Sequence, residues 1–349
     1  MQAKMGPVVL FGSGEIAASA QAVYDQIMQP LRPPVRVSVL ETPAGFQLNS
    51  ADVAGAVADY IREHLPNYRP QVSVVAARKR GTPYSPDDPV IVAPLLTSQV
   101  IFLGPGSPTY AARQLRGSLA WQIAQARHRM GHALVLASAA TIAASAWAIP
   151  VYEIYKVGQE LHWQPGLDLF GAFGLSIVFV PHWNNNEGGE KHDTSRCFMG
   201  QPRFEALLRL LPPGLTIVGI DEYTALIVDP EEGACRVLGA GAVTLVRPNG
   251  DERYETGQMI PCDALGDFVR PALEDGLPPE VLAMIAAAEA ELAQPLEPPA
   301  EVLALVAERQ AARAARDWAA SDRLRDAIRV LGWEVRDARE GPELSPRSP

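Results

Sequence analysis

Short apolar runs alternate with amphipathic stretches through the first two-thirds of the chain, and this alternation constrains the fold most strongly. The apolar runs predict strands at residues 8–12, 35–41, 72–76, 100–104, 133–137 and 175–180. The stretches between them predict helices at residues 16–28, 51–64, 89–96, 110–129 and 141–148. Strands and helices in turn at this spacing indicate βαβ units. We therefore expect an α/β fold with a doubly wound, mostly parallel sheet.

The pattern changes twice in the last third of the chain. Residues 216–246 hold short strand-like runs joined by turn residues, which predict an antiparallel edge on the parallel sheet. Near residue 276 the composition becomes rich in alanine, proline and charge. We expect a main domain at 1–275, a proline-containing linker with a helix at 276–300, and a C-terminal helical appendage. The appendage is predicted as a helical hairpin at 301–341 with a disordered tail at 342–349.

Charge and cysteine content narrow the class of protein. The 349 residues carry a net charge of −10, which argues against a nucleic-acid-binding surface over the whole molecule and permits a cationic substrate. The three cysteines are far apart, so neither a disulfide framework nor a zinc site is expected. The N-terminus lacks the pattern of a secretory signal, and no apolar window is long enough for a membrane span. We expect a cytoplasmic protein without a membrane partner.

Two apolar runs end in side chains that can perform nucleophilic catalysis. In the segment VFVPHWNN, residues 178–185, the apolar run ends at His182. In the segment ALVLASAAT, residues 133–141, it ends at Ser138. Open α/β sheets place their chemistry just beyond the ends of their strands. A serine on a strand-to-helix turn and a histidine at another strand end suggest a nucleophile and its base. Ser138 at the start of an alanine-rich helix also fits a plain N-cap.

A carboxylate is needed to orient the histidine, and the sequence offers two candidates. Glu222 follows the apolar run TIVGI, and Glu153 follows the helix that begins after Ser138. The glycine-rich segment FLGPGSPTY, residues 102–110, could expose backbone amides to a developing negative charge, or simply begin a helix. Asn184 and Asn185 are expected to line a specificity pocket for a peptide or small-molecule substrate.

Taken together, these motifs resemble the cyanophycinase and α-aspartyl dipeptidase family of serine peptidases, which have a class I glutamine amidotransferase-like fold. The likeness runs from Val8 to about Val246 and rests on the order of the segments FGSGE, FLGPGSPTYAARQL, LASAAT, PHWNN and GIDEYTALIV. It implies Ser138 as nucleophile, His182 as base and Glu222 as orienting acid, with the amides of Gly106 and Ala139 as the oxyanion hole. The dipeptidase branch would favour Glu153 as the acid instead.

The chain departs from this family at the nucleophile. Leu136 and Ala140 occupy the positions of the two elbow glycines. A catalytically degenerate binding protein is therefore the alternative to a hydrolase. The segment 184–200 is longer than in cyanophycinases, and its Arg196 and the following Arg203 are candidates for binding a substrate carboxylate.

The C-terminal segment has a separate resemblance. Its spacing of Arg309, Arg313, Asp317, Asp322 and Arg325 is similar to the helical tail of cysteinyl-tRNA synthetases. A tRNA-associated accessory role is one alternative that this implies. Residues 301–349 contain nine arginines and nine acidic residues, so a nucleic-acid partner is not expected. No metal cluster or dinucleotide fingerprint occurs, so no cofactor is expected, and a homodimer is the commonest assembly for such a chain.

Overall fold

The computed structural model describes residues 4–247, 249–294, 297–338 and 341–346. The chain divides into two compact units, Met1–Glu289 and Ala290–Pro349, which we call the main unit and the C-terminal unit. The division lies inside helix α9 (Pro279–Leu292), later than the boundary predicted near residue 276. The reason is that Val281 and Ile285 of α9 are buried in the core of the main unit.

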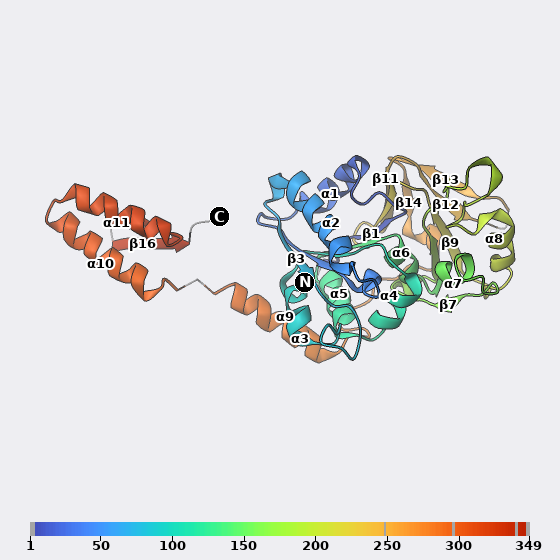
Figure 1. The fold of residues 1–349 in the computed structure, drawn as a ribbon, viewed down its shortest axis with the longest axis horizontal. Helices are drawn as coiled ribbons and strands as arrows, with labels where there is room; N and C mark the ends of the chain where they lie inside the picture. Colours follow the sequence, from blue (N-terminus) through green and yellow to red (C-terminus); the bar gives the residue numbers. More distant parts are fainter. Residues whose placement is uncertain (1–3, 248, 295–296, 339–340, 347–349) are drawn as a thin grey trace. The chain divides into compact units, whose positions relative to one another are not determined.

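An eight-stranded sheet forms the centre of the main unit and confirms the predicted fold class (Figure 1). Its strands β1, β5, β4, β2 and β3 are parallel, and β10, β11 and β14 continue the sheet antiparallel beyond β1. In spatial order the strands are β14 (Met259–Pro261), β11 (Ala234–Gly239), β10 (Thr224–Asp229), β1 (Val8–Phe11), β5 (Ala133–Ala137), β4 (Val100–Leu103), β2 (Arg36–Leu40) and β3 (Gln71–Val75).

Helices cover both faces of this sheet (Figure 1). The reason is that side chains of its central strands point alternately to the two faces and are apolar on both faces. On β1, Val9 and Phe11 pack with helices α1 (Gln21–Met28) and α2 (Ser50–His64). Leu10 faces the opposite core. The helices of that core are α3 (Pro89–Val92), α4 (Pro108–Leu115), α5 (Leu119–Arg129), α6 (Ala139–Ala143) and α9.

A second sheet of four strands differs from the prediction. Its order is β13 (Glu252–Glu255), β12 (Ala242–Val246), β9 (Thr216–Ile220) and β8 (Ile177–Val180), and only β8 and β9 are parallel. The run at 175–180 was expected in the main sheet, and the strands after residue 216 were expected at one edge of it. Instead they are shared between two sheets. An apolar run indicates a buried strand without naming its partner, so pairing could not be read from the pattern.

Short elements pack around the second sheet and form a third apolar core. Helices α7 (Val151–Tyr155) and α8 (Gly200–Leu208) contribute Val151, Ile154, Phe204 and Leu207 to it. The paired strands β6 (Trp147–Ala148) and β7 (Gln164–Pro165) lie in the same part of the chain. The helix predicted at 141–148 therefore ends early, at Ala143.

The helix predicted at 110–129 is two helices in the structure, α4 and α5. Gly117 has a φ of +66°, which interrupts the helical backbone. Ser118 then caps α5, because its side chain accepts a hydrogen bond from the amide of Trp121 at 3.2 Å. The sequence RGS between the two helices was the signal for this break.

The C-terminal unit contains helices α10 (Ala300–Ala314) and α11 (Trp318–Val330), followed by the antiparallel strands β15 (Trp333–Ala338) and β16 (Gly341–Pro346). Its small core consists of Val302, Val306, Ile328, Trp333 and Val335. The helical hairpin was predicted, and the β-hairpin was not. The tail expected to be disordered from residue 342 is a strand as far as Pro346, because it pairs with β15. The rest of that prediction, 347–349, falls outside the described residues.

Candidate active site

Ser138 occupies a strained turn between β5 and α6. Its backbone has φ 51° and ψ −106°, a region that residues with a side chain rarely adopt. Its amide donates to the carbonyl of Phe11 at 3.2 Å, and its hydroxyl makes no capping bond to α6. The geometry is therefore that of a sharp strand-to-helix turn that projects the serine oxygen, and differs from the N-cap that the sequence also allowed.

Leu136 and Ala140 fit this turn although they replace glycines of the resembled family. Both are buried in the core that contains α5, so the leucine side chain packs in the protein interior. The carbonyl of Leu136 accepts a hydrogen bond from the Thr141 hydroxyl at 3.0 Å, and the same hydroxyl donates to Phe11 at 2.9 Å. These bonds tie the two sides of the turn together.

His182 follows β8 of the second sheet and reaches across to Ser138. Its Nε2 atom lies 2.9 Å from the Ser138 hydroxyl oxygen. Its own backbone is left-handed, with φ 52°. Its carbonyl accepts hydrogen bonds from the amides of Asn185 at 3.2 Å and Cys197 at 3.1 Å. Two hydrogen bonds therefore fix the backbone that carries the imidazole.

Glu222 lies on the other side of the imidazole, in the crossing from β9 in the second sheet to β10 in the main sheet. Its Oε1 atom is 3.1 Å from His182 Nδ1 and accepts a second hydrogen bond from Asn185 Nδ2 at 2.9 Å. The bond with His182, supported by Asn185, holds the pKa of Glu222 below its ordinary value, although partial burial acts in the opposite direction. An ionised Glu222 fixes the proton on Nδ1, which leaves Nε2 free to accept the serine proton.

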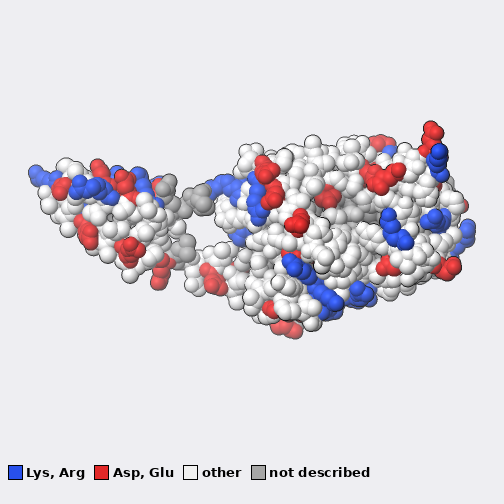
Figure 2. Space-filling model, in the orientation of Figure 1, with Lys and Arg blue, Asp and Glu red and all other residues white. Residues whose placement is uncertain are grey.

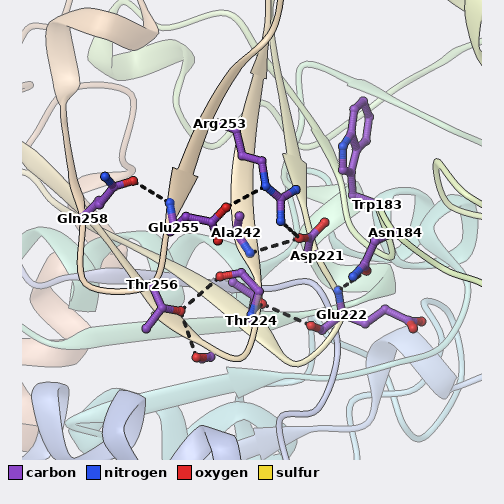
Figure 3. Close-up of polar contacts among 12 residues, drawn as sticks. Trp183, Asn184, Asp221, Glu222, Thr224, Ala242, Arg253, Glu255, Thr256 and Gln258 are labelled. Carbon is purple, nitrogen blue, oxygen red and sulfur yellow. Dashed lines mark hydrogen bonds and ion pairs between the residues drawn. The ribbon is translucent and has the colours of Figure 1, made fainter.

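The turn that carries Glu222 is anchored by its neighbours (Figure 3). The carboxylate of the preceding residue, Asp221, is buried and accepts hydrogen bonds from the Ala242 amide and from Arg253, both at 3.0 Å. The Glu222 amide donates to Asn184 Oδ1 at 2.8 Å. At Gly12, at the end of β1, an added Cβ would lie 2.1 Å from the Asp221 carbonyl, so this turn approaches the main sheet closely.

A cavity of about 220 Å³, which we call the serine cavity, opens beside Ser138 and His182. Gly106 and Ala139 line it. Ala139 is the first residue of α6, so its amide has no acceptor within the helix. Gly106 has a φ of +152°, and an added Cβ would lie 2.0 Å from the Pro43 carbonyl, so only glycine fits there. The two predicted oxyanion residues thus border the same space as the serine.

The structure does not bring every predicted substrate residue to the serine cavity. Asn184 and Asn185 bind Glu222 instead. Arg196 lies over the Trp183 ring at 3.8 Å and donates to the Trp183 carbonyl at 3.1 Å. Arg203 is exposed on α8 and is not among the residues that line the cavity. Polar residues near a histidine can contact its neighbours as readily as a substrate, and the sequence did not distinguish the two uses.

Glu153, the alternative acid, lies in a different place. It lines a second cavity together with Thr109 and Tyr152, and its Oε2 atom is buried without a hydrogen-bond partner. Tyr152 lines both cavities. The geometry therefore pairs His182 with Glu222.

Several residues of the site were not predicted. Cys197 and Phe198 line the serine cavity, and together with Arg196 they form a left-handed turn, with φ of 58°, 67° and 55°. Burial raises the pKa of the Cys197 thiol to about 12, so it stays protonated at neutral pH. Lys156 and Glu187 also line the cavity. No sequence signal marks a left-handed turn that is made without glycine.

Two classes of feature are absent from the described ranges. Among these residues, none of the helices is long and apolar enough to cross a membrane. The same part of the chain holds no group of three or more histidine, cysteine, aspartate or glutamate side chains arranged to hold a metal ion.

The main unit has a known fold. The chain is similar to the crystal structure of a peptidase from an acI-B1 Actinobacterium, with a TM-score of 0.60 and 18% identity over 75% of this chain and 98% of that one. A putative peptidase E protein from Listeria monocytogenes EGD-e matches with a TM-score of 0.43 and 13% identity, over 72% of this chain and 100% of that one. At such identities the likeness to the actinobacterial peptidase shows the fold alone.

Curated relatives match only a short part of the chain. A cysteine–tRNA ligase of Methanosarcina acetivorans is 52% identical over 48 residues, which are 14% of this chain and 10% of the ligase. Cysteine–tRNA ligase 1 of Burkholderia lata is 50% identical over 46 residues, or 13% of this chain and 10% of the ligase. The chain thus spans about a tenth of the length of these relatives. No model of a known protein family matches it.

Proposed function

We propose that this protein is a serine-type hydrolase that cleaves a peptide-like amide through an acyl-enzyme on Ser138. The observation that carries the proposal is the continuous chain of contacts from Ser138 through His182 to Glu222, at 2.9 Å and 3.1 Å. A nucleophile, a base and an orienting acid within hydrogen-bond reach are the parts that such chemistry requires. The fold shared with a solved peptidase supports the same class of reaction.

Each group has a defined part in the proposed reaction. The Ser138 hydroxyl gives its proton to His182 Nε2 as its oxygen bonds to the substrate carbonyl carbon. The amides of Gly106 and Ala139 donate to the resulting oxyanion. His182 then returns the proton to the leaving amine as the C–N bond breaks. Water, deprotonated by the same histidine, hydrolyses the acyl ester and restores Ser138, while Glu222 keeps the imidazole oriented and stabilises its charge.

A search for turnover tests this proposal directly. The full chain is incubated with a mixture of peptides and isopeptides, and the products are identified by mass spectrometry. The chain with Ser138→Ala is the inactive form, and the chain with Ser176→Ala, an exposed serine, is the matched control. Cleavage by the wild type and the control alone supports the proposal. If the folded wild type cleaves nothing in the mixture, the degenerate binding protein becomes the better account.

The C-terminal unit supports a second and weaker candidate, a tRNA-associated accessory role. The match of 48 residues of this chain to a cysteine–tRNA ligase favours this reading. The arginines of the C-terminal unit favour it less, because Arg309 is 1% exposed and forms a two-bond ion pair with Asp337, which Arg313 also contacts. Basic and acidic side chains are interspersed on the face of this unit in Figure 2. Binding of tRNA by the full chain that weakens steeply with salt would support the candidate, and no binding at low salt would reject it.

A further inference from the structure

The second cavity, which has Glu153 in its lining, adjoins the serine cavity and has a volume of about 470 Å³. Tyr152 lines both spaces, and the segment 106–110 contributes residues to each of them. The volume falls within the range of about 300–1,000 Å³ that is usual for pockets that hold small molecules. A substrate group attached close to an amide at Ser138 therefore has room in the second cavity.

Large apolar side chains are exposed around this cavity. Phe46 is 49% exposed, Tyr152 40% and Val157 70%, and all three line it. Single exposed apolar residues are ordinary on protein surfaces, whereas several that gather at one hollow mark a place where a ligand removes apolar surface from water. Phe46 also packs against Tyr110, another lining residue, with ring centroids 5.3 Å apart. The two rings therefore form a continuous apolar wall.

Several polar groups of the lining residues are already engaged or buried. The Tyr110 hydroxyl donates to the Arg78 carbonyl at 2.9 Å, and the Ser107 hydroxyl oxygen accepts a hydrogen bond from the Tyr110 amide at 3.2 Å. The Thr109 hydroxyl oxygen and Oε2 of Glu153 are buried from solvent, so neither atom faces the cavity. These residues therefore present mainly ring and hydrocarbon surface to a ligand.

Arg113 adds a charge to the lining of this cavity. It is exposed on α4, and its guanidinium lies 5.3 Å from the Tyr110 ring centroid. Solvent screens an exposed charge, and the methylene groups of an arginine cover apolar surface. Arg113 is therefore compatible with an apolar ligand. An anionic group is the alternative that this side chain would favour, and a charged probe distinguishes the two.

We propose that the second cavity is a substrate subsite for an apolar side chain, aromatic or branched aliphatic, which packs against Phe46, Tyr110 and Val157. This inference rests on the hydrolase function proposed above and names its class of substrate, a peptide-like amide with such a side chain close to the scissile bond. Continuity with the serine cavity through Tyr152 assigns the space to the substrate. Binding is driven by removal of apolar surface from water on both partners.

The test compares the affinities of four amides that share one backbone and differ in their side chain, by ligand-observed NMR with the full chain at neutral pH. The probes are the N-acetylated amides of phenylalanine, alanine, lysine and glutamate. We expect the phenylalanine probe to bind on the order of ten-fold more tightly than the alanine probe, because its side chain buries more apolar surface. It should also bind more tightly than both charged probes.

Two variants with matched controls locate the site. Phe46→Ala should reduce the preference for phenylalanine over alanine by about three-fold or more, whereas Leu48→Ala, at a fully exposed position two residues away, should retain it. Val157→Asp should also reduce the preference, because it adds a charge to the cavity wall. Val90→Asp, at an exposed position on α3, is its control. Circular dichroism establishes that all four variants are folded.

Three outcomes would overturn the proposal. They are equal or undetectable binding of the phenylalanine and alanine probes, tightest binding of the lysine or glutamate probe, and a phenylalanine preference that is unchanged in both Phe46→Ala and Val157→Asp. None of these measurements depends on the reactivity of Ser138, which labelling by a fluorophosphonate measures separately. A reactive Ser138 without the preference refutes the subsite alone. The preference with an unreactive Ser138 refutes the hydrolase function and leaves an apolar ligand site.

Discussion

Two glutamates near the same serine have opposite surroundings. Glu222 Oε1 receives hydrogen bonds from both His182 and Asn185, and the residue's amide is held by Asn184. Glu153 lines the second cavity, and its Oε2 atom is buried with no hydrogen-bond partner. The difference separates two states of a carboxylate. A satisfied carboxylate holds a neighbouring group in one orientation, whereas a buried oxygen without a partner costs free energy.

Removing the base is the change with the largest expected effect, because it removes the group on which Glu222 acts. We expect His182→Ala to lower the rate of amide cleavage, or of reaction with an organophosphorus probe, by about 10⁴-fold or more. The exposed His64→Ala on α2 is the matched control. Loss of less than about ten-fold in His182→Ala would mean that another group activates Ser138.

Substitution of Glu222 tests whether this carboxylate orients the imidazole of His182. Glu222→Gln keeps the shape and removes the charge that fixes the Nδ1 proton, so we expect a loss of about 10³-fold in the same rates. Glu205→Gln, exposed on α8, should leave them unchanged. Rates that are equal in Glu222→Gln and the control would show that this carboxylate does not orient the base.

The lowered pKa of Glu222 also predicts a dependence on pH. A depressed acid pKa means that its stabilising contribution is complete above the ordinary glutamate pKa and is lost as pH falls through the lowered value. We therefore expect wild type to lose folding stability with acid more steeply than Glu222→Gln over that range. Thermal unfolding followed from pH 7 down through the glutamate range measures this, and parallel curves would contradict it.

Asn185 offers a finer test, because its side chain contacts the carboxylate of Glu222 and not the imidazole of His182. Asn185→Leu removes one of the two donors to Glu222 Oε1, and we expect a loss of about ten-fold in the rates. The neighbouring Asn186→Leu is the control. An effect on substrate KM with kcat unchanged would instead restore the substrate-binding role that the sequence suggested for Asn185.

The smallest expected effect is on the free energy of unfolding. Substitution of the two glutamates should change it in opposite directions. Glu222→Gln should lower the free energy of unfolding by about 1 kcal/mol, because it weakens two hydrogen bonds to a charged group. Glu153→Gln should raise it by about 1 kcal/mol or less, because a buried oxygen without a partner loses its charge. Denaturant unfolding at neutral pH measures both. Destabilisation by Glu153→Gln would mean that its carboxylate is satisfied after all.

The sequence indicated that Ser138 and His182 lie close together, as the structure shows, but it did not indicate their surroundings. Ser138 and His182 each follow an apolar run that predicts a strand. Residues just beyond the end of a strand lie at the edge of the sheet, where open α/β folds bind their ligands. The choice between Glu222 and Glu153 stayed open because it depends on pairing between sheets. The structure places His182 and Glu222 at the ends of β8 and β9, which are parallel neighbours. Side chains such as Asn185 and Arg196 were assigned to substrate because composition does not reveal whether a polar group faces a cavity or a neighbour.

The turn at Ser138 shows the same limit in another form. Leu136 and Ala140 suggested a damaged elbow, because glycine is the residue expected where the backbone is strained. The strain lies at Ser138 itself, with φ 51°, and both substituted residues pack into the core. The C-terminal β-hairpin was missed because residues 301–341 were predicted as a helical hairpin and the proline-containing residues 342–349 as a disordered tail. Pairing with Trp333–Ala338 is a contact that composition does not report.

Labelling of the intact protein by a fluorophosphonate, followed by peptide mapping, tests the central claim most directly. The account predicts a covalent adduct on Ser138 that is absent in Ser138→Ala and strongly reduced in His182→Ala. A folded protein that remains unlabelled, or an adduct that persists in Ser138→Ala, would contradict an activated serine at this site.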